Sequence, residues 1–103
     1  MAVSTIKMDN HIPSWEYVGD VYWWGNSWTC PDDGFIELNV TPSASNWYWY
    51  VKDTNAPTGW SHNMMGASQN QQSMTFMVKK GSVLSTATSS GLGTVHAYYY
   101  KFV

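Results

Sequence analysis

Hydrophobic and polar residues alternate in short runs along most of this chain, and turn-forming residues separate the runs. The clearest run is residues 35–41, in which Ile36, Leu38 and Val40 share one face. A period of two is typical of β-strands that bury one side. No segment keeps apolar residues at the 3.6-residue spacing of an amphipathic helix. The pattern therefore predicts an all-β protein with those three side chains in its core.

The run at residues 46–52 differs because large rings occupy both of its faces. Trp47 and Trp49 share one face, and Tyr48 and Tyr50 share the other. We expect neither face to be freely solvated. With these two runs we expect about eight strands, while residues 60–65 are ambiguous and residues 66–72 and 88–93 are predicted loops. The other predicted strands are residues 3–8, 15–18, 21–24, 28–30, 73–79, 82–87 and 94–103.

The length and composition favour one folded domain. The chain has 103 residues, of which 44% are hydrophobic, enough for a packed core. Short strands separated by turns predict a single β-sandwich spanning residues 1–103. Residues 1–27 are expected to be either an attachment segment or the first strands of that sandwich.

The charge pattern argues against several classes of partner. The formal net charge is −2, and the basic residues are five lysines with no arginine. Nucleic acid binding needs a basic surface, so we expect no nucleic acid partner. There is no basic amphipathic stretch or long apolar run, so we expect no membrane insertion. The first residues do not match a secretory signal peptide, so we expect no signal peptide in this chain.

Catalytic and metal-binding patterns are missing from the sequence. None of the three histidines pairs with another at ligand spacing, and Cys30 is the single cysteine. We therefore predict no metal and no cofactor, and a buried Cys30. Asp32 and Asp33 precede Gly34, as expected of a turn and not of a pair of catalytic acids. We find no nucleophile motif or phosphate loop, and we predict that the protein is not an enzyme.

Aromatic residues are the most unusual part of the composition, with seven Trp and seven Tyr. They either fill the core and join subunits, or form a stacking platform for sugar rings beside amide side chains. Low positive charge favours a neutral ligand over a phosphate backbone. The predicted ligand-binding residues are Trp24, Asn26, Trp28, Tyr48, Tyr50, Trp60, Asn63 and Asn70. The predicted oligomer-interface residues are Trp47, Trp49, Tyr98, Tyr100 and Phe102.

Three segments resemble one known family. Residues 28–36 read Trp-Thr-Cys-Pro-Asp-Asp-Gly-Phe-Ile, residues 77–84 read Met-Val-Lys-Lys-Gly-Ser-Val-Leu, and residues 96–102 form an aromatic end. In this order they resemble the small tip domains of bacteriophage tail fibres. The chain departs from that pattern at Met77, where proline is usual, and at Ser82, where aspartate is usual.

This resemblance implies a jelly-roll sandwich like that of the C1q and tumour necrosis factor families, assembled as a homotrimer. It also implies a virion protein of the phage tail that is made in the bacterial cytoplasm and adheres to a host-surface glycan or contacts another virion protein. Two alternatives stay open. The domain is a structural virion adaptor, cap or decoration protein whose aromatics form subunit interfaces, or it is a cellular carbohydrate-binding lectin.

Overall fold

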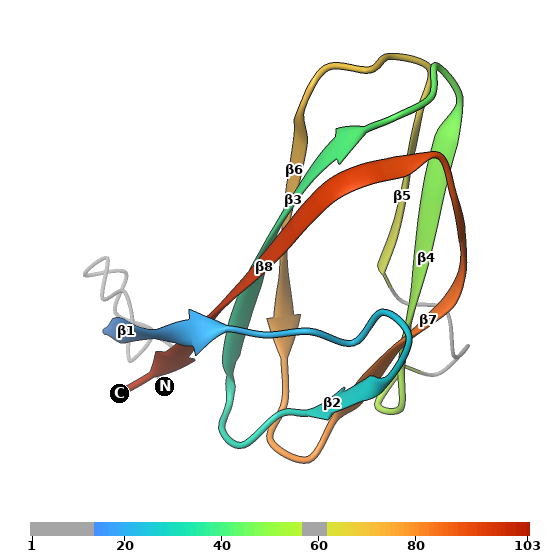
Figure 1. The fold of residues 1–103 in the computed structure, drawn as a ribbon. Coiled ribbons are helices and arrows are strands. Elements are labelled where there is room, and N and C mark those ends of the chain that lie inside the picture. Colours follow the sequence, from blue (N-terminus) through green and yellow to red (C-terminus); the bar gives the residue numbers. More distant parts are fainter. Residues whose placement is uncertain (1–13, 57–61) are drawn as a thin grey trace, which may run out of the picture.

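A computed structural model describes residues 14–56 and 62–103 of the chain. Eight strands in these ranges form two four-stranded antiparallel sheets (Figure 1). The first sheet has the order β1-β8-β3-β6, and the second has the order β2-β7-β4-β5. The predicted strand at residues 3–8 lies outside the described residues. The strands are β1 (Trp15–Asp20), β2 (Ser27–Thr29), β3 (Gly34–Pro42), β4 (Trp47–Asp53), β5 (His62–Gly66), β6 (Gln72–Val78), β7 (Val83–Ser90) and β8 (Leu92–Phe102).

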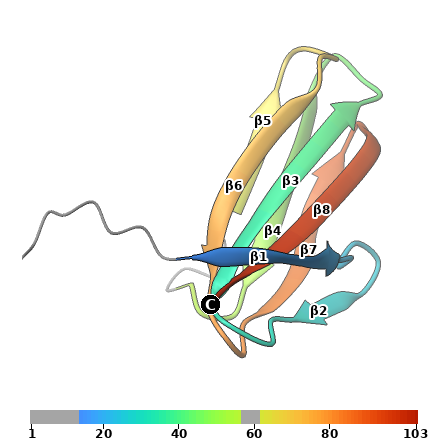
Figure 2. The same cartoon turned by 90° about the vertical axis from the view of Figure 1, so that its left-hand side faces the viewer.

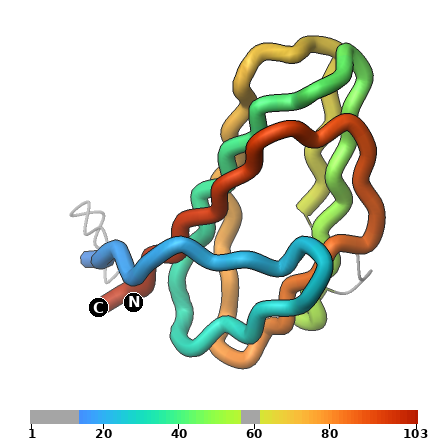
Figure 3. Tube along the Cα trace, viewed as in Figure 1, coloured from blue at the N-terminus to red at the C-terminus, as the bar shows by residue number. Residues whose placement is uncertain are grey.

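The pairing of the strands follows a nested order. β1 pairs with β8, β2 with β7, β3 with β6 and β4 with β5, all antiparallel. The chain thus resembles one long hairpin that is rolled into two sheets, as the tube in Figure 3 shows. This is the strand order of a jelly roll. The prediction of a β-sandwich of jelly-roll type with about eight strands is confirmed.

Alternating residues of the two sheets meet in the core. On β3, Ile36, Leu38 and Val40 are fully buried, as the alternation predicted. On β4 of the opposite sheet, Trp49 and Val51 are also fully buried. Burial of apolar surface is the main favourable contribution to folding, so this interior fixes which face of each strand points outward.

The connection between β1 and β2 adds a large ring to the core. Val21 and Trp23 are buried while Tyr22 is exposed, so side chains alternate between the core and the surface as in a strand. Nevertheless, the prediction of a strand at residues 21–24 is wrong, because the chain there crosses from the first sheet to the second. The Trp23 ring lies 5.6 Å from the Trp49 ring and 6.3 Å from the Phe76 ring, so it contacts both sheets.

The Ser- and Gly-rich segment 88–93 also differs from its prediction. It is not a flexible loop, because β7 continues to Ser90 and β8 begins at Leu92. Gly91 makes the turn between them at a φ of 73°, a conformation that glycine adopts readily. Ser90 lies opposite Tyr48 of β4, and Thr88 lies opposite Tyr50. Pairing with a neighbouring strand therefore overrides the weak strand preference of this segment.

Candidate functional site

The outer face of the first sheet carries a continuous group of aromatic rings. Phe35 lies opposite Tyr100, and Tyr100 lies opposite Tyr17 on the edge strand β1. The Phe35 and Tyr100 rings stack at 4.7 Å with an interplanar angle of 11°. Figure 2 views this sheet from outside, with β6, β3 and β8 side by side and β1 crossing their lower ends. We call this surface the aromatic face, formed by Trp15, Tyr17, Phe35, Tyr98, Tyr100 and Phe102.

Two hydroxyl groups on the aromatic face, those of Tyr17 and Tyr100, are hydrogen-bonded to carboxylates of the same chain. The Tyr100 hydroxyl donates to Glu37 at 3.1 Å, and burial together with this hydrogen bond raises the pKa of Tyr100. The Tyr17 hydroxyl donates to Asp20, which raises the pKa of Tyr17 to about 12. Trp15 and Tyr17 are nevertheless 50% and 53% exposed. The aromatic face thus presents mainly ring surface to its surroundings.

A different surface lies on the outer face of the second sheet. The Tyr48 and Tyr50 rings of β4 are 5.3 Å apart there, at an angle of 42°. They line an open cleft of about 600 Å³ that we call the tyrosine cleft. Its other outward residues are Asn46, Met65, Ala67 and Ser90.

Trp47 and Gly66 also line the tyrosine cleft and fix its end. The two residues lie opposite each other on β4 and β5. The Trp47 indole Nε1 donates to the Ser68 carbonyl oxygen at 3.1 Å, which anchors the ring. A Cβ atom on Gly66 would lie 2.8 Å from that Nε1 atom. Glycine is therefore required at position 66 for the indole to lie against the backbone.

The structure brings together three of the predicted ligand-binding residues. Tyr48 and Tyr50 line the tyrosine cleft, and Asn63 lies directly opposite Tyr50 on β5. Asn70 is exposed in the β5–β6 connection, where its backbone N–H donates to the Ser68 hydroxyl. Trp60 lies outside the described residues.

The other predicted ligand-binding residues belong to a separate region. The ring centroids of Trp24 and Trp49 are 5.3 Å apart. Trp49 is on the inner face of β4, whereas Tyr48 and Tyr50 point outward. Trp28 contacts Tyr99, a core residue of the opposite sheet, with ring centroids 5.0 Å apart. Both rings are half-buried against the core, and Asn26 is exposed in the turn before β2. One ligand on the tyrosine cleft therefore cannot also stack on Trp24 or Trp28.

The predicted oligomer-interface residues fall into two groups, one on the aromatic face and one in the core. Tyr98, Tyr100 and Phe102 belong to the aromatic face. The prediction is wrong for Trp47 and Trp49, which are 3% and 0% exposed within a single chain. Their large rings suggested more aromatic surface than one chain could bury, but a single sandwich buries both side chains. Sequence reasoning missed Trp15, Tyr17 and Phe35 on the aromatic face and Met65 in the cleft. For Phe35 a signal existed, because alternation on residues 35–41 places it on the face that points away from the core.

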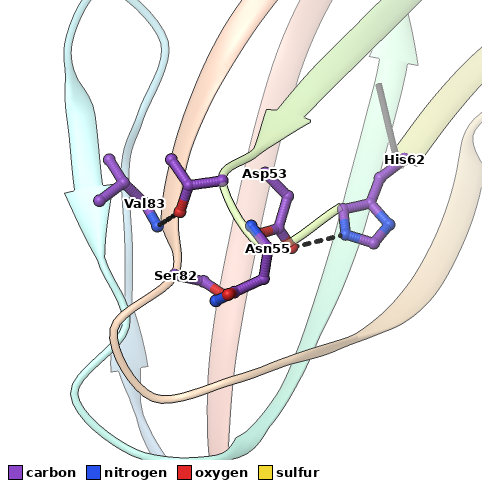
Figure 4. Close-up of polar contacts among 6 residues, drawn as sticks. Asp53, Asn55, His62, Ser82 and Val83 are labelled. Atoms are coloured by element: carbon purple, nitrogen blue, oxygen red, sulfur yellow. Dashed lines mark hydrogen bonds and ion pairs between the residues drawn. The ribbon is translucent and has the colours of Figure 1, made fainter. Parts of the chain in front are cut away.

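A polar cluster holds the start of the β4–β5 connection (Figure 4). The buried Asp53 carboxylate accepts the Asn55 backbone N–H at 2.9 Å and lies 3.2 Å from the His62 Nε2 atom. Burial lowers the pKa of His62, and Asp53 opposes this effect. The Asn55 side chain donates to the Ser82 hydroxyl, and the Thr54 hydroxyl accepts the Val83 backbone N–H. These contacts tie the end of β4 to β7.

Cys30 belongs to a second buried cluster, between β2 and β3. Its Sγ atom donates to the Asp32 carbonyl oxygen at 2.9 Å, and the Tyr99 hydroxyl donates to the same oxygen at 2.6 Å. Burial raises the pKa of the Cys30 thiol. The prediction of a buried cysteine is confirmed. The neighbouring Asp33 carboxylate accepts the Lys80 backbone N–H at 2.8 Å, so it holds the turn to the β6–β7 connection.

Neither the described residues nor comparisons with known proteins indicate a further site. Within residues 14–56 and 62–103, no group of three or more His, Cys, Asp or Glu side chains is placed to hold a metal ion. In the same ranges, no helix is long and apolar enough to cross a membrane. No protein-family model, curated protein or solved structure matches this chain. The tyrosine cleft and the aromatic face are therefore the candidate functional surfaces of the described residues.

Proposed function

We propose that this domain is a bacteriophage tail-fibre tip that adheres to a host-surface glycan without catalysis. The tyrosine cleft carries the proposal. A pyranose presents a C–H face that packs on an aromatic ring, while its hydroxyls seek neutral hydrogen-bonding groups. Tyr48 and Tyr50 supply the rings, and Asn46, Asn63 and Ser90 supply amide and hydroxyl groups beside them.

The same proposal assigns the aromatic face to homotrimer assembly. Trp15, Tyr17 and Met77 are each at least half exposed on this side of the sandwich. Large exposed apolar patches on soluble proteins usually mark contact sites. Three copies packed around an axis would cover these rings and leave the tyrosine cleft on the opposite side open to a ligand. The resemblance of residues 28–102 to tail-fibre tips supports this arrangement.

The proposal is tested by binding of the purified full chain to an array of bacterial surface polysaccharides. We expect at least one polysaccharide to bind. Tyr48→Ala combined with Tyr50→Ala should reduce binding at least tenfold, by analogy with bases stacked on aromatic side chains, where loss of one ring costs about 1–3 kcal/mol. Tyr22→Ala is the matched control, since Tyr22 is 62% exposed in the β1–β2 connection. Failure of the folded protein to bind any polysaccharide would overturn the adhesion proposal.

A second candidate is favoured by the aromatic face itself. Its six rings contact one another across three strands of the first sheet, β1, β8 and β3, whereas the outward rings of the tyrosine cleft are the single pair Tyr48 and Tyr50. A virion adaptor, cap or decoration protein would use such a face to contact another subunit. This candidate predicts stable assembly together with no polysaccharide binding. The array and a sedimentation experiment on the same sample separate the two candidates.

A further inference from the structure

The tyrosine cleft has a polar side and an apolar side, and this asymmetry bears on which sugar it fits. Ser90 of β7 lies opposite Tyr48 on one side, and Met65 of β5 lies opposite Tyr48 on the other. Directly opposed side chains in antiparallel sheets are about 5 Å apart, within reach of a single ligand. Met65 is 64% exposed, so its thioether is available at the surface. A ring placed over Tyr48 would meet a hydroxyl at one edge and an apolar group at the other.

The next row along the strands is polar on both sides. Asn63 lies opposite Tyr50 on β5, and Thr88 lies opposite Tyr50 on β7. Their amide and hydroxyl groups suit the hydroxyls of a sugar, which both donate and accept hydrogen bonds. Among the four residues directly opposite Tyr48 and Tyr50 on β5 and β7, Met65 is thus the apolar one.

The lining of the tyrosine cleft carries no acidic or basic side chain. Lys52 is the next outward residue of β4 after Tyr50, and it is exposed, but it does not line the cleft. Strong recognition of a carboxylate, sulfate or phosphate in proteins uses charge-assisted hydrogen bonds from Arg or Lys. The cleft therefore offers its binding groups to an uncharged ligand.

We infer that the tyrosine cleft takes a neutral glycan whose sugar carries a methyl group, with that methyl against Met65 and the hydroxyls toward Ser90 and Asn63. The inference rests on the proposed function and names its ligand class. Two kinds of sugar share this chemistry: 6-deoxy sugars, which carry the methyl on the ring, and N-acetylated sugars, which carry it on the amide.

The test compares free monosaccharides, which carry no added methyl aglycone, as ligands of the full chain by calorimetry or ligand-observed NMR. The probes are fucose and rhamnose for the 6-deoxy class, N-acetylglucosamine and N-acetylgalactosamine for the second class, and glucose, galactose and glucuronic acid as references. We expect one methyl-bearing class to bind about fourfold or more tighter than glucose and galactose, since one buried methyl contributes that factor. Which class binds tighter identifies the source of the methyl group.

Variants link the preference to its side chain. Met65→Gln should reduce the methyl preference to less than twofold, while Met77→Gln, an equally exposed methionine on the first sheet, should leave it unchanged. Lys52→Gln should not change any affinity by more than twofold. This inference would be overturned if glucose bound as tightly as the methyl-bearing sugars, or if glucuronic acid bound more tightly than they do. If Tyr48→Ala abolished that binding, the adhesion proposal would still stand. Absence of binding by every saccharide, including the polysaccharide array, would overturn the adhesion proposal itself.

Discussion

The aromatic face and the tyrosine cleft are built by the same alternation on opposite sides of one sandwich, yet their chemistry differs. On the aromatic face, Tyr17 and Tyr100 direct their hydroxyls to carboxylates of their own chain, and the rings contact other rings. In the tyrosine cleft, the rings of Tyr48 and Tyr50 lie beside the neutral polar residues Asn46 and Ser90 and the apolar residues Met65 and Ala67. A wide surface of rings suits contact with another protein, whereas a small ring pair with directional polar neighbours suits a small ligand.

The largest expected effect tests the division between core and cleft along β4. Trp49→Ala should lower the free energy of unfolding by about 3–5 kcal/mol, since the ring is fully buried and a cavity would remain. Tyr48→Ala, one residue away but facing outward, should cost about 1 kcal/mol or less. Urea denaturation of both variants measures the difference. Similar losses for the two would contradict the assigned register.

The second prediction tests the strand pair beneath the aromatic face. A Cβ atom on Gly34 would lie 2.0 Å from the Tyr100 backbone oxygen, so Gly34→Ala must push β3 and β8 apart. We expect a loss of about 3 kcal/mol in thermal or chemical denaturation. Gly19→Ala, in the same sheet, is the control because its added Cβ would meet nothing within 4 Å. Equal stability of the two variants would show that β3 and β8 do not approach so closely.

The third prediction assigns self-association to one face only. Tyr98→Lys places a charge within the aromatic face and should weaken formation of the proposed trimer at least tenfold in sedimentation equilibrium, because a buried unpaired charge is strongly unfavourable. Tyr48→Lys makes the same change in the tyrosine cleft and should leave association unchanged. A wild-type chain that sediments as a monomer at micromolar concentration would refute the trimer. Loss of association in Tyr48→Lys alone would place the interface on the second sheet.

The smallest expected effect is a dependence of stability on pH. Burial lowers the pKa of His62 below its unfolded value of about 6.5, so the unfolded chain binds more protons than the native chain at slightly acidic pH. Stability should therefore fall as the pH decreases from about 6.5, and it should be regained above that value. Denaturation midpoints between pH 5 and 8 measure the trend. His62→Gln should flatten it, and an unchanged slope in this variant would assign the effect to other groups.

Local alternation predicted the parts of the fold that depend on one strand at a time. Ile36, Leu38 and Val40 entered the core as expected. On residues 46–52, alternation separated Trp47 and Trp49 from Tyr48 and Tyr50 but did not tell which pair faces the core. The segments 21–24 and 88–93 were predicted wrongly because their structure depends on distant partners. Residues 88–93 form strands through pairing with β4 and β3, and nothing in their own composition reveals those partners.

The candidate site was predicted in part for the same reason. Ring size drew attention to Trp24, Trp28, Trp47 and Trp49, but size does not tell whether a ring points into the core or outward. Met65 carried no signal of its own, since it lay in a segment of ambiguous pattern. Its place beside Tyr48 follows from the β4–β5 register, which only the folded structure supplies.

The enclosed position of Cys30 makes its thiol a built-in reporter of local opening. It is the single cysteine of the chain, and it is 1% exposed beneath Asp32 and Tyr99. A thiol-reactive dye can label it only when the corner between β2 and β3 opens away from its neighbours, which are Tyr99 of β8 and the β6–β7 connection at Gly81 and Ser82. The labelling rate of the unmodified protein therefore records how often one end of the sandwich opens, without any engineered probe. Slower labelling in the presence of a bound sugar or at higher protein concentration would report stabilisation of that corner by ligand or by assembly.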